Sequence, residues 1–163
     1  MAATVQIVEK NGAGGTQTDK TSGTIRFKNA DNSTVDTNDP LVKPTSGTDY
    51  SFEKWIRFNV SGGSYTQITN IEAYSDGSSG LGTGVGLFAK TVASYATPAE
   101  ATATTGYTDF FTYTSGSALS LGAGPFTSTG EKADHLVMIM TVDNTASGGV
   151  TSSETLTIAW DEI

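Results

Sequence analysis

The sequence contains no cysteine and a single histidine, His135. The absence of cysteine excludes thiol catalysis and cysteine-ligated zinc or iron–sulfur sites. It is also unlike the disulfide-rich scaffolds of small secreted proteins, and it fits synthesis in a reducing cytoplasm. A chain of 163 residues can bury a sizeable core without such links, so neither a disulfide nor a metal is required for folding.

Charge is scarce and unbalanced. Only 16% of the residues are charged, and the formal net charge is -8. An acidic surface repels phosphate backbones, so we expect no nucleic-acid partner. Long apolar runs are missing too, since the longest, 136–140, is far too short to span a bilayer. We therefore expect no membrane association, and the opening residues lack the basic and apolar regions of a signal peptide.

Helical periodicity is almost absent, whereas strand patterns recur along the chain between Gly-, Ser- and Asn-rich turns. The predicted strands are 4–9, 24–28, 52–61, 67–75, 85–93, 108–113, 135–143 and 155–161. The one candidate helix, residues 97–101, has Pro98 at its first position, and a surface loop is the alternative. We predict an all-β fold with little or no helix, an antiparallel β-sandwich of jelly-roll or Ig-like kind with about eight strands.

The domain organisation follows from the same patterns. We predict one domain over residues 1–163, because no change in composition indicates a second. Residues 1–22 are weakly patterned after the opening strand and are predicted to form a flexible N-terminal arm. Residues 30–49 are polar and contain two prolines, which predicts a long loop that crosses between the sheets.

Catalytic chemistry finds little support in the residues. Asp134 cannot orient His135 in the usual way, because successive strand residues point to opposite faces. The seven glutamates are scattered, and no pair stands out as the two carboxylates of a glycosidase. We predict that the protein is not an enzyme and has no catalytic residue and no cofactor.

A polar stretch and a glycine-rich stretch each have two interpretations. Residues 31–39 resemble a calcium loop in composition but lack the order of an EF-hand, so a solvated polar loop is the alternative and we predict no metal site. Residues 80–86 carry glycine at every second position without the sequence of a phosphate loop. We interpret 80–84 as a loop, and Gly86 as a strand position where a neighbour packs closely.

Residues 51–60 are the most informative segment. Ile56, Phe58 and Val60 fall on one face of a strand and predict core. Trp55 and Arg57 fall on the other face among polar residues. Either a loop of the chain covers Trp55, with Arg57 stacked on it, or Trp55 anchors a protein interface, where tryptophan and arginine are enriched.

Two segments show apolar residues on both faces. They are 135–142 and 108–113, and each is either a central strand of a covered sheet or half of a subunit interface. With so few charges on the chain, we predict a homo-oligomer. The predicted interface residues are Trp55, Arg57, Tyr74 and Phe110.

Several phrase-like runs resemble small virion proteins of tailed bacteriophages, especially the capsid-decoration or cement type. These runs are SFEKWIRFNVSGG, ITNIEAYSDGSSGLGTGVGLFAKTVASYATPAEA, GYTDFFTYTSGS, GPFTSTGE and the closing ETLTIAWDEI. The resemblance covers about half the chain or more and includes no catalytic motif. It implies a β-rich protein, often trimeric, that binds the major capsid protein on the outer surface of the virion and reinforces the shell.

Two alternatives remain open at this point. One is a different virion component, a head fibre or a tail module. The other is a carbohydrate-binding β-sandwich module, which would need exposed aromatic side chains in a row, with Trp55, Tyr65 and Tyr74 as candidates. In the virion interpretation, the chain is synthesised in the host cytoplasm and assembled onto particles there.

Overall fold

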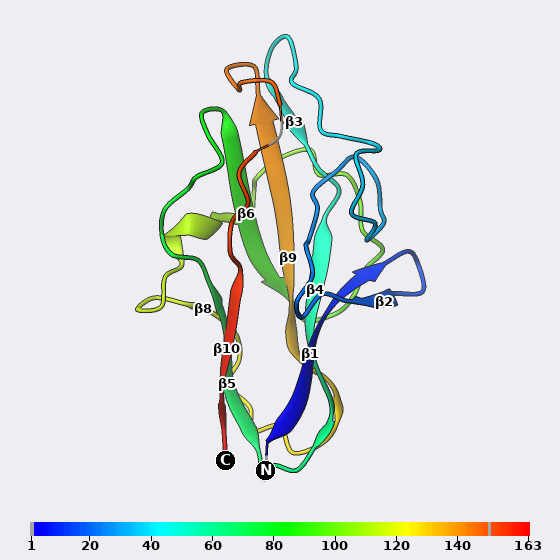
Figure 1. Cartoon of the computed structure of the whole chain (residues 1–163), viewed down its shortest axis with the longest axis vertical. Coiled ribbons are helices and arrows are strands. Elements are labelled where there is room, and N and C mark those ends of the chain that lie inside the picture. Colours follow the sequence, from blue (N-terminus) through cyan, green and yellow to red (C-terminus); the bar gives the residue numbers. More distant parts are fainter. Residues whose placement is uncertain (1, 150) are drawn as a thin grey trace.

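The computed structural model describes residues 2–149 and 151–163 (Figure 1). Within these residues the chain forms ten strands and one short 3₁₀ helix, η1. The elements are β1 (Ala3–Asn11), β2 (Thr16–Asp19), β3 (Thr48–Tyr50), β4 (Lys54–Gly63), β5 (Ile68–Tyr74), β6 (Val85–Val92), β7 (Thr108–Asp109), η1 (Phe110–Thr112), β8 (Leu119–Gly122), β9 (Gly130–Asp143) and β10 (Thr157–Glu162).

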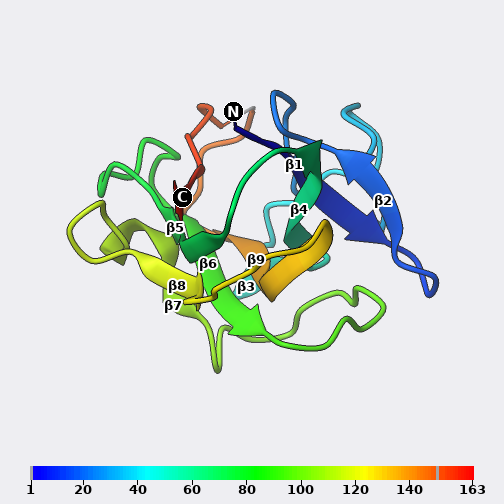
Figure 2. The ribbon, with the colours of Figure 1, turned by 90° about the horizontal axis from the view of Figure 1, so that it is seen from below.

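The strands make two antiparallel sheets that pack face to face. The larger sheet has the order β2-β1-β4-β9-β6-β7, with β3 pairing with the far end of β9. The smaller sheet has the order β10-β5-β8. Figure 2 shows β1, β4, β9 and β6 curving around one side of the molecule, with β5 and β8 on the other. The prediction of an antiparallel β-sandwich is confirmed.

The core lies between the two sheets because alternate residues of each strand point inward. From the larger sheet, Phe58 and Leu136 are 1% and 0% exposed, and from the smaller sheet Ile71 is 0% exposed. The predicted core face of β4 is confirmed, since these inward residues form one continuous cluster: Ile56, Phe58, Val60, Leu136, Met138, Ile71, Ala73 and Leu121.

Six predicted strands are confirmed with shifted ends, and two predictions need correction. Residues 24–28 form no strand: Lys28 O accepts a hydrogen bond from Phe52 N, and Asn29 N donates to Asp39 O, so this backbone bonds to loops rather than to a ladder. In 108–113 the strand ends at Asp109, whose side chain accepts from Phe111 N and caps η1. The three strands that the pattern missed, β2, β3 and β8, have only three or four residues each.

The segments predicted as arm and loop take different forms. Most of residues 1–22 lies in the larger sheet as β1 and β2. The predicted loop 30–49 is part of a longer segment without a strand, residues 20–47 between β2 and β3, which is called the polar loop below, and β3 begins at Thr48. The glycine-rich stretch is a loop up to Gly84, as predicted, and a Cβ at Gly86 would lie 2.6 Å from the Phe88 ring and 2.9 Å from Thr141 Oγ1.

A loop over residues 93–107 covers the outer face of the larger sheet. It takes the place of the candidate helix at 97–101, so the loop alternative holds there. Its backbone bonds to the strand entrance, where Glu53 N donates to Ala99 O and Ala101 N donates to Ser51 O. Beneath it, Val137 and Ile139 of β9 are 0% exposed. The two-sided apolar strand is therefore a central strand of a covered sheet.

Candidate functional site

Two charged residues of the larger sheet point inward, in phase with its core residues. Glu9 lies opposite Ile56, and Lys54 lies opposite Met138. Both side chains are 0% exposed, and Lys54 Nζ lies 3.0 Å from Glu9 Oε1. Burial lowers the pKa of Lys54 by more than the neighbouring Glu9 carboxylate raises it. Removing one member of a buried ion pair leaves an uncompensated buried charge, which is strongly destabilising.

The polar loop between β2 and β3 supplies further partners for both Lys54 and Glu9. Lys54 Nζ donates to Asn32 O at 2.7 Å, and Lys20 Nζ donates to Ser33 O at 2.7 Å. Lys20 Nζ also lies 3.6 Å from Glu9 Oε2. A further loop lysine, Lys28, is 1% exposed and binds Asp36 Oδ1 at 2.7 Å. We name Glu9, Lys20, Lys28, Asp36 and Lys54 the inner ionic cluster, and it fixes the polar loop against the sheet.

The outer face of the larger sheet carries an aromatic cluster of Trp55, Tyr95 and His135. Trp55 is 3% exposed, with its ring centroid 5.3 Å from that of Tyr95 and 5.4 Å from that of His135. Arg57 Nη1 lies 3.0 Å from His135 Nδ1. Burial, and then the charge of Arg57, lower the pKa of His135 below its ordinary value. The imidazole is therefore neutral at neutral pH and serves packing.

Glu53 ties the covering loop to the same face. Its carboxylate accepts hydrogen bonds from Trp55 Nε1 at 2.9 Å and from Tyr107 Oη at 2.6 Å, and Lys90 Nζ lies 3.3 Å away. Burial alone would raise the pKa of Glu53, but these partners outweigh it and hold the pKa below its usual range. The buried ionisable groups on both faces thus act as structural ties.

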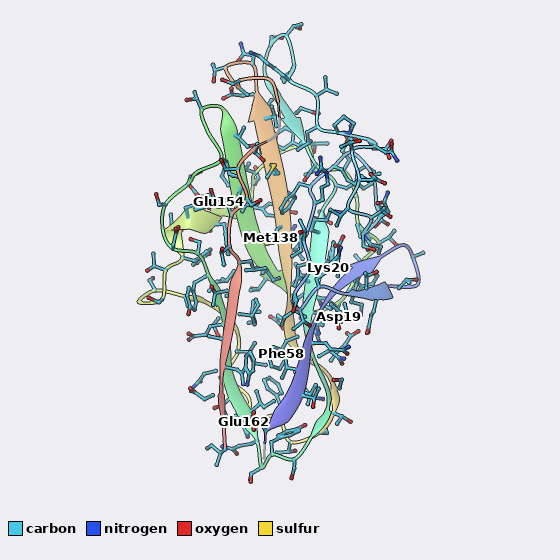
Figure 3. The ribbon with its side chains drawn as sticks, viewed as in Figure 1. Asp19, Lys20, Phe58, Met138, Glu154 and Glu162 are labelled. Carbon is cyan, nitrogen blue, oxygen red and sulfur yellow. The ribbon has the colours of Figure 1, made fainter. Side chains whose placement is uncertain are left out.

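One flank of the sandwich is open. A groove of about 960 Å³ runs between the inner face of the larger sheet and β10. One wall is made by Val5, Ile7, Val85, Leu87, Met138, Met140 and Val142, and the other by Leu81, Phe110, Leu156, Ile158 and Trp160. Several of these apolar side chains are only half-buried, and Trp160 is 38% exposed. In Figure 3, Lys20 and Glu154 flank the groove and Met138 lies between them.

Two strand edges border this groove. β10 pairs with β5 on one side, and within the described residues no strand pairs with its other edge. β2 pairs with β1 only from Val8 to Asn11, and the chain just after β2 bonds to Ile7, since Lys20 N donates to Ile7 O and Ile7 N donates to Thr21 Oγ1. Residues 3–6 have no strand partner on that side. At the end of the groove marked by Phe58 and Glu162 (Figure 3), Ala3 N donates to Glu162 Oε1 at 2.9 Å. The two edges are therefore held together at one end and apart elsewhere.

Charges on the groove are uneven. The polar loop contributes Lys20, Arg26 and Lys43 to its lining, whereas the segment before β10 contributes Glu154. Among residues 2–149 and 151–163, Arg26 and Lys43 form no ion pair within 4.0 Å. Glu154 is engaged, since its Oε1 accepts from Gly80 N at 2.5 Å. The apolar groove thus carries two cations, Arg26 and Lys43, that have no ion-pair partner in the described residues, on a chain whose net charge is -8.

The predicted interface residues do not gather in one place. Trp55 is buried beneath Tyr95, as in the first of the two alternatives. That alternative had Arg57 stacked on Trp55, whereas the ring neighbours of Trp55 are Tyr95 and His135 and its hydrogen-bond partner is Glu53. Phe110 is 1% exposed and is part of the groove lining. Arg57 is half-buried in β4 of the larger sheet, and Tyr74 is half-buried in β5 of the smaller one. Their role at an interface stays a prediction.

Metal, membrane and family comparisons add no further site. In the described part of the chain, no group of three or more His, Asp or Glu side chains could hold a metal ion. Nor does that part contain a helix with the length and hydropathy of a membrane span. Comparisons of the chain with protein-family models, with curated proteins and with solved structures found no match.

Proposed function

We propose that this chain is a structural virion protein that binds the outer surface of a phage capsid and stabilises it. The observation that carries the proposal is the open apolar flank between β1 and β10. Half-buried apolar side chains beside unpaired strand edges are typical of surfaces that become covered on assembly. The resemblance to decoration proteins supplies the setting, a capsid lattice.

The mechanism is mechanical. A protein that binds only the assembled shell stabilises it by mass action, and many copies repeat the effect over the lattice. The ties on both faces of the larger sheet suit this role, because they hold the covering segments in fixed positions. A rigid surface loses less conformational entropy when it binds.

The carbohydrate-binding alternative has less support from the geometry. Its three candidate aromatic residues lie on separate elements: Trp55 is buried in β4, Tyr65 follows that strand, and Tyr74 belongs to the other sheet. An exposed row of rings, which such a module uses to stack on sugars, is not formed by these residues.

The test is a binding experiment with capsids. Expanded phage capsids that lack this protein are incubated with the purified chain, sedimented and analysed for bound protein, and their melting temperature is measured. We expect saturable binding and a higher melting temperature of the shell. Absence of binding to these capsids, or binding equal to that seen with unexpanded shells and with unrelated particles, would refute the proposal.

A further inference from the structure

We propose that the groove between β1 and β10 binds an extended segment of a partner polypeptide, with apolar residues at alternate positions and carboxylates at one end. This inference deepens the proposed function and rests on it for the identity of the partner, the capsid protein. The groove itself can be tested separately.

The strand edges indicate a peptide rather than a compact apolar ligand. On the edge of β1, Ile7 is already bonded, because Lys20 N donates to Ile7 O and Ile7 N donates to Thr21 Oγ1. Residues 4–6 of β1 and the outer edge of β10 have no strand partner on the groove side among the described residues. An added strand satisfies such groups with main-chain hydrogen bonds. The contact of Ala3 N with Glu162 Oε1 closes one end, so the segment would enter from the other end.

The walls indicate which side chains the segment carries. Ile7 and Met140 line the side of the larger sheet, and Ile158 lines the side of β10. In an extended segment every second side chain points to the same face. Apolar residues at every second position would fill the groove. The residues between them would face solvent, so we expect them to be polar.

The cations on the groove indicate in which direction the partner segment lies. Arg26 and Lys43 lie on the polar-loop side of the groove without an ion-pair partner in the described residues. Carboxylates at one end of the bound segment would meet them, and lysines there would be repelled. The net charge of -8 on the chain as a whole would disfavour an acidic partner anywhere else.

The experiment uses the full chain and a synthetic peptide. The probe is a capped ten-residue peptide with valine and threonine alternating and two glutamates at one end. Trp160 lies in the groove and is 38% exposed, whereas the only other tryptophan, Trp55, is 3% exposed. We expect the peptide to shift the emission of Trp160 to shorter wavelength and to saturate. Calorimetry gives the affinity.

Variants separate the contributions. Reversing the rim charges with Arg26→Glu and Lys43→Glu should weaken the affinity for the peptide about tenfold, because two weak attractive contacts with its glutamates become repulsive. The control is Lys132→Glu, which reverses one lysine outside the groove lining, and it should leave the affinity unchanged; the single variant Lys43→Glu is its matched counterpart in the groove. Leu156→Asp places a charge in the apolar wall and should abolish binding; if it fails to fold, the charge-reversal variant carries the test.

Control peptides and capsids decide the remaining outcomes. A peptide of the same composition with its valines in one block, and one with lysine in place of glutamate, should bind at least tenfold more weakly. Equal binding of all three peptides, no binding of the probe, or uptake of oleate in place of the peptide would overturn the inference. If capsids bind the wild-type chain and the charge-reversal variant equally, the inference fails while the proposed function stands. If the probe binds and capsids do not, the groove stands and the function fails.

Discussion

The inner face of the larger sheet is covered in two different ways. Around Phe58, the smaller sheet packs on it and the contact is apolar, with Ile71 from β5 fully buried. Around Lys54, the irregular loop between β2 and β3 lies on it, and the contact is ionic. Both parts exclude water, yet one contains hydrocarbon and the other a buried lysine and glutamate.

The difference follows from what each cover brings with it. A strand already bonds its backbone groups to neighbouring strands, so it can present apolar side chains alone. An irregular loop brings carbonyl groups that have no ladder, such as Asn32 O and Ser33 O, and a buried carbonyl needs a donor. Lys54 and Lys20 are those donors, and Glu9 balances their charge. Polar residues on a core face therefore mark the place where a loop covers a sheet.

The largest effect is expected from breaking the ionic part. Lys54→Met leaves Glu9 without its closest partner and Asn32 O without a donor, which should lower the free energy of unfolding by about 3–5 kcal/mol. Urea denaturation measures this loss. The double variant Glu9→Leu with Lys54→Met should be more stable than Lys54→Met alone, because no carboxylate is left uncompensated. A loss below about 1 kcal/mol for Lys54→Met would contradict this account.

A smaller effect is expected in the apolar part. Ile71→Val removes one methylene group from a fully buried position in β5, and should lower the free energy of unfolding by about 0.5–1.5 kcal/mol. The same urea experiment compares the two parts directly. If Ile71→Val costs as much as Lys54→Met, then loop-covered and sheet-covered regions do not differ in the way described here.

The last prediction concerns the outer face and depends on pH. The pKa of His135 in the folded chain lies below its ordinary 6.5 because of burial and Arg57. As pH falls below 6.5 the unfolded chain takes up this proton before the folded one, so stability should decrease, by at most about 1.4 kcal/mol per pH unit. Glu53 and Glu131, whose pKa values are lowered from 4.5, titrate below that window. Denaturation between pH 7 and pH 5 should show this slope, and His135→Asn should remove it.

Sequence alone predicted the sandwich and the core face of β4, because Ile56, Phe58 and Val60 alternate cleanly. The same alternation places Lys54 in phase with Ile56, and Glu9 in phase with Ile7, so the pattern itself contains the signal for a buried ionic pair. The rule that buried charges require partners would have directed attention to the neighbouring loop lysines.

The groove could not be predicted in this way. It depends on how β1 and β10 lie relative to each other, and they come from opposite ends of the chain. Val5 and Ile158 have the pattern of core residues, and the pattern is the same whether their partner belongs to this chain or to another. The burial of Trp55 likewise depends on Tyr95, which a distant loop supplies.

The most direct test of the central claim is hydrogen–deuterium exchange on the chain, free and bound to expanded capsids. The claim is that the open flank is the surface that engages a partner. We predict that binding slows exchange of the backbone amides in residues 4–6 and 157–162, with little change in β7 and β8. Unchanged exchange along β1 and β10 in capsid-bound protein, or protection confined to other segments, would contradict the claim.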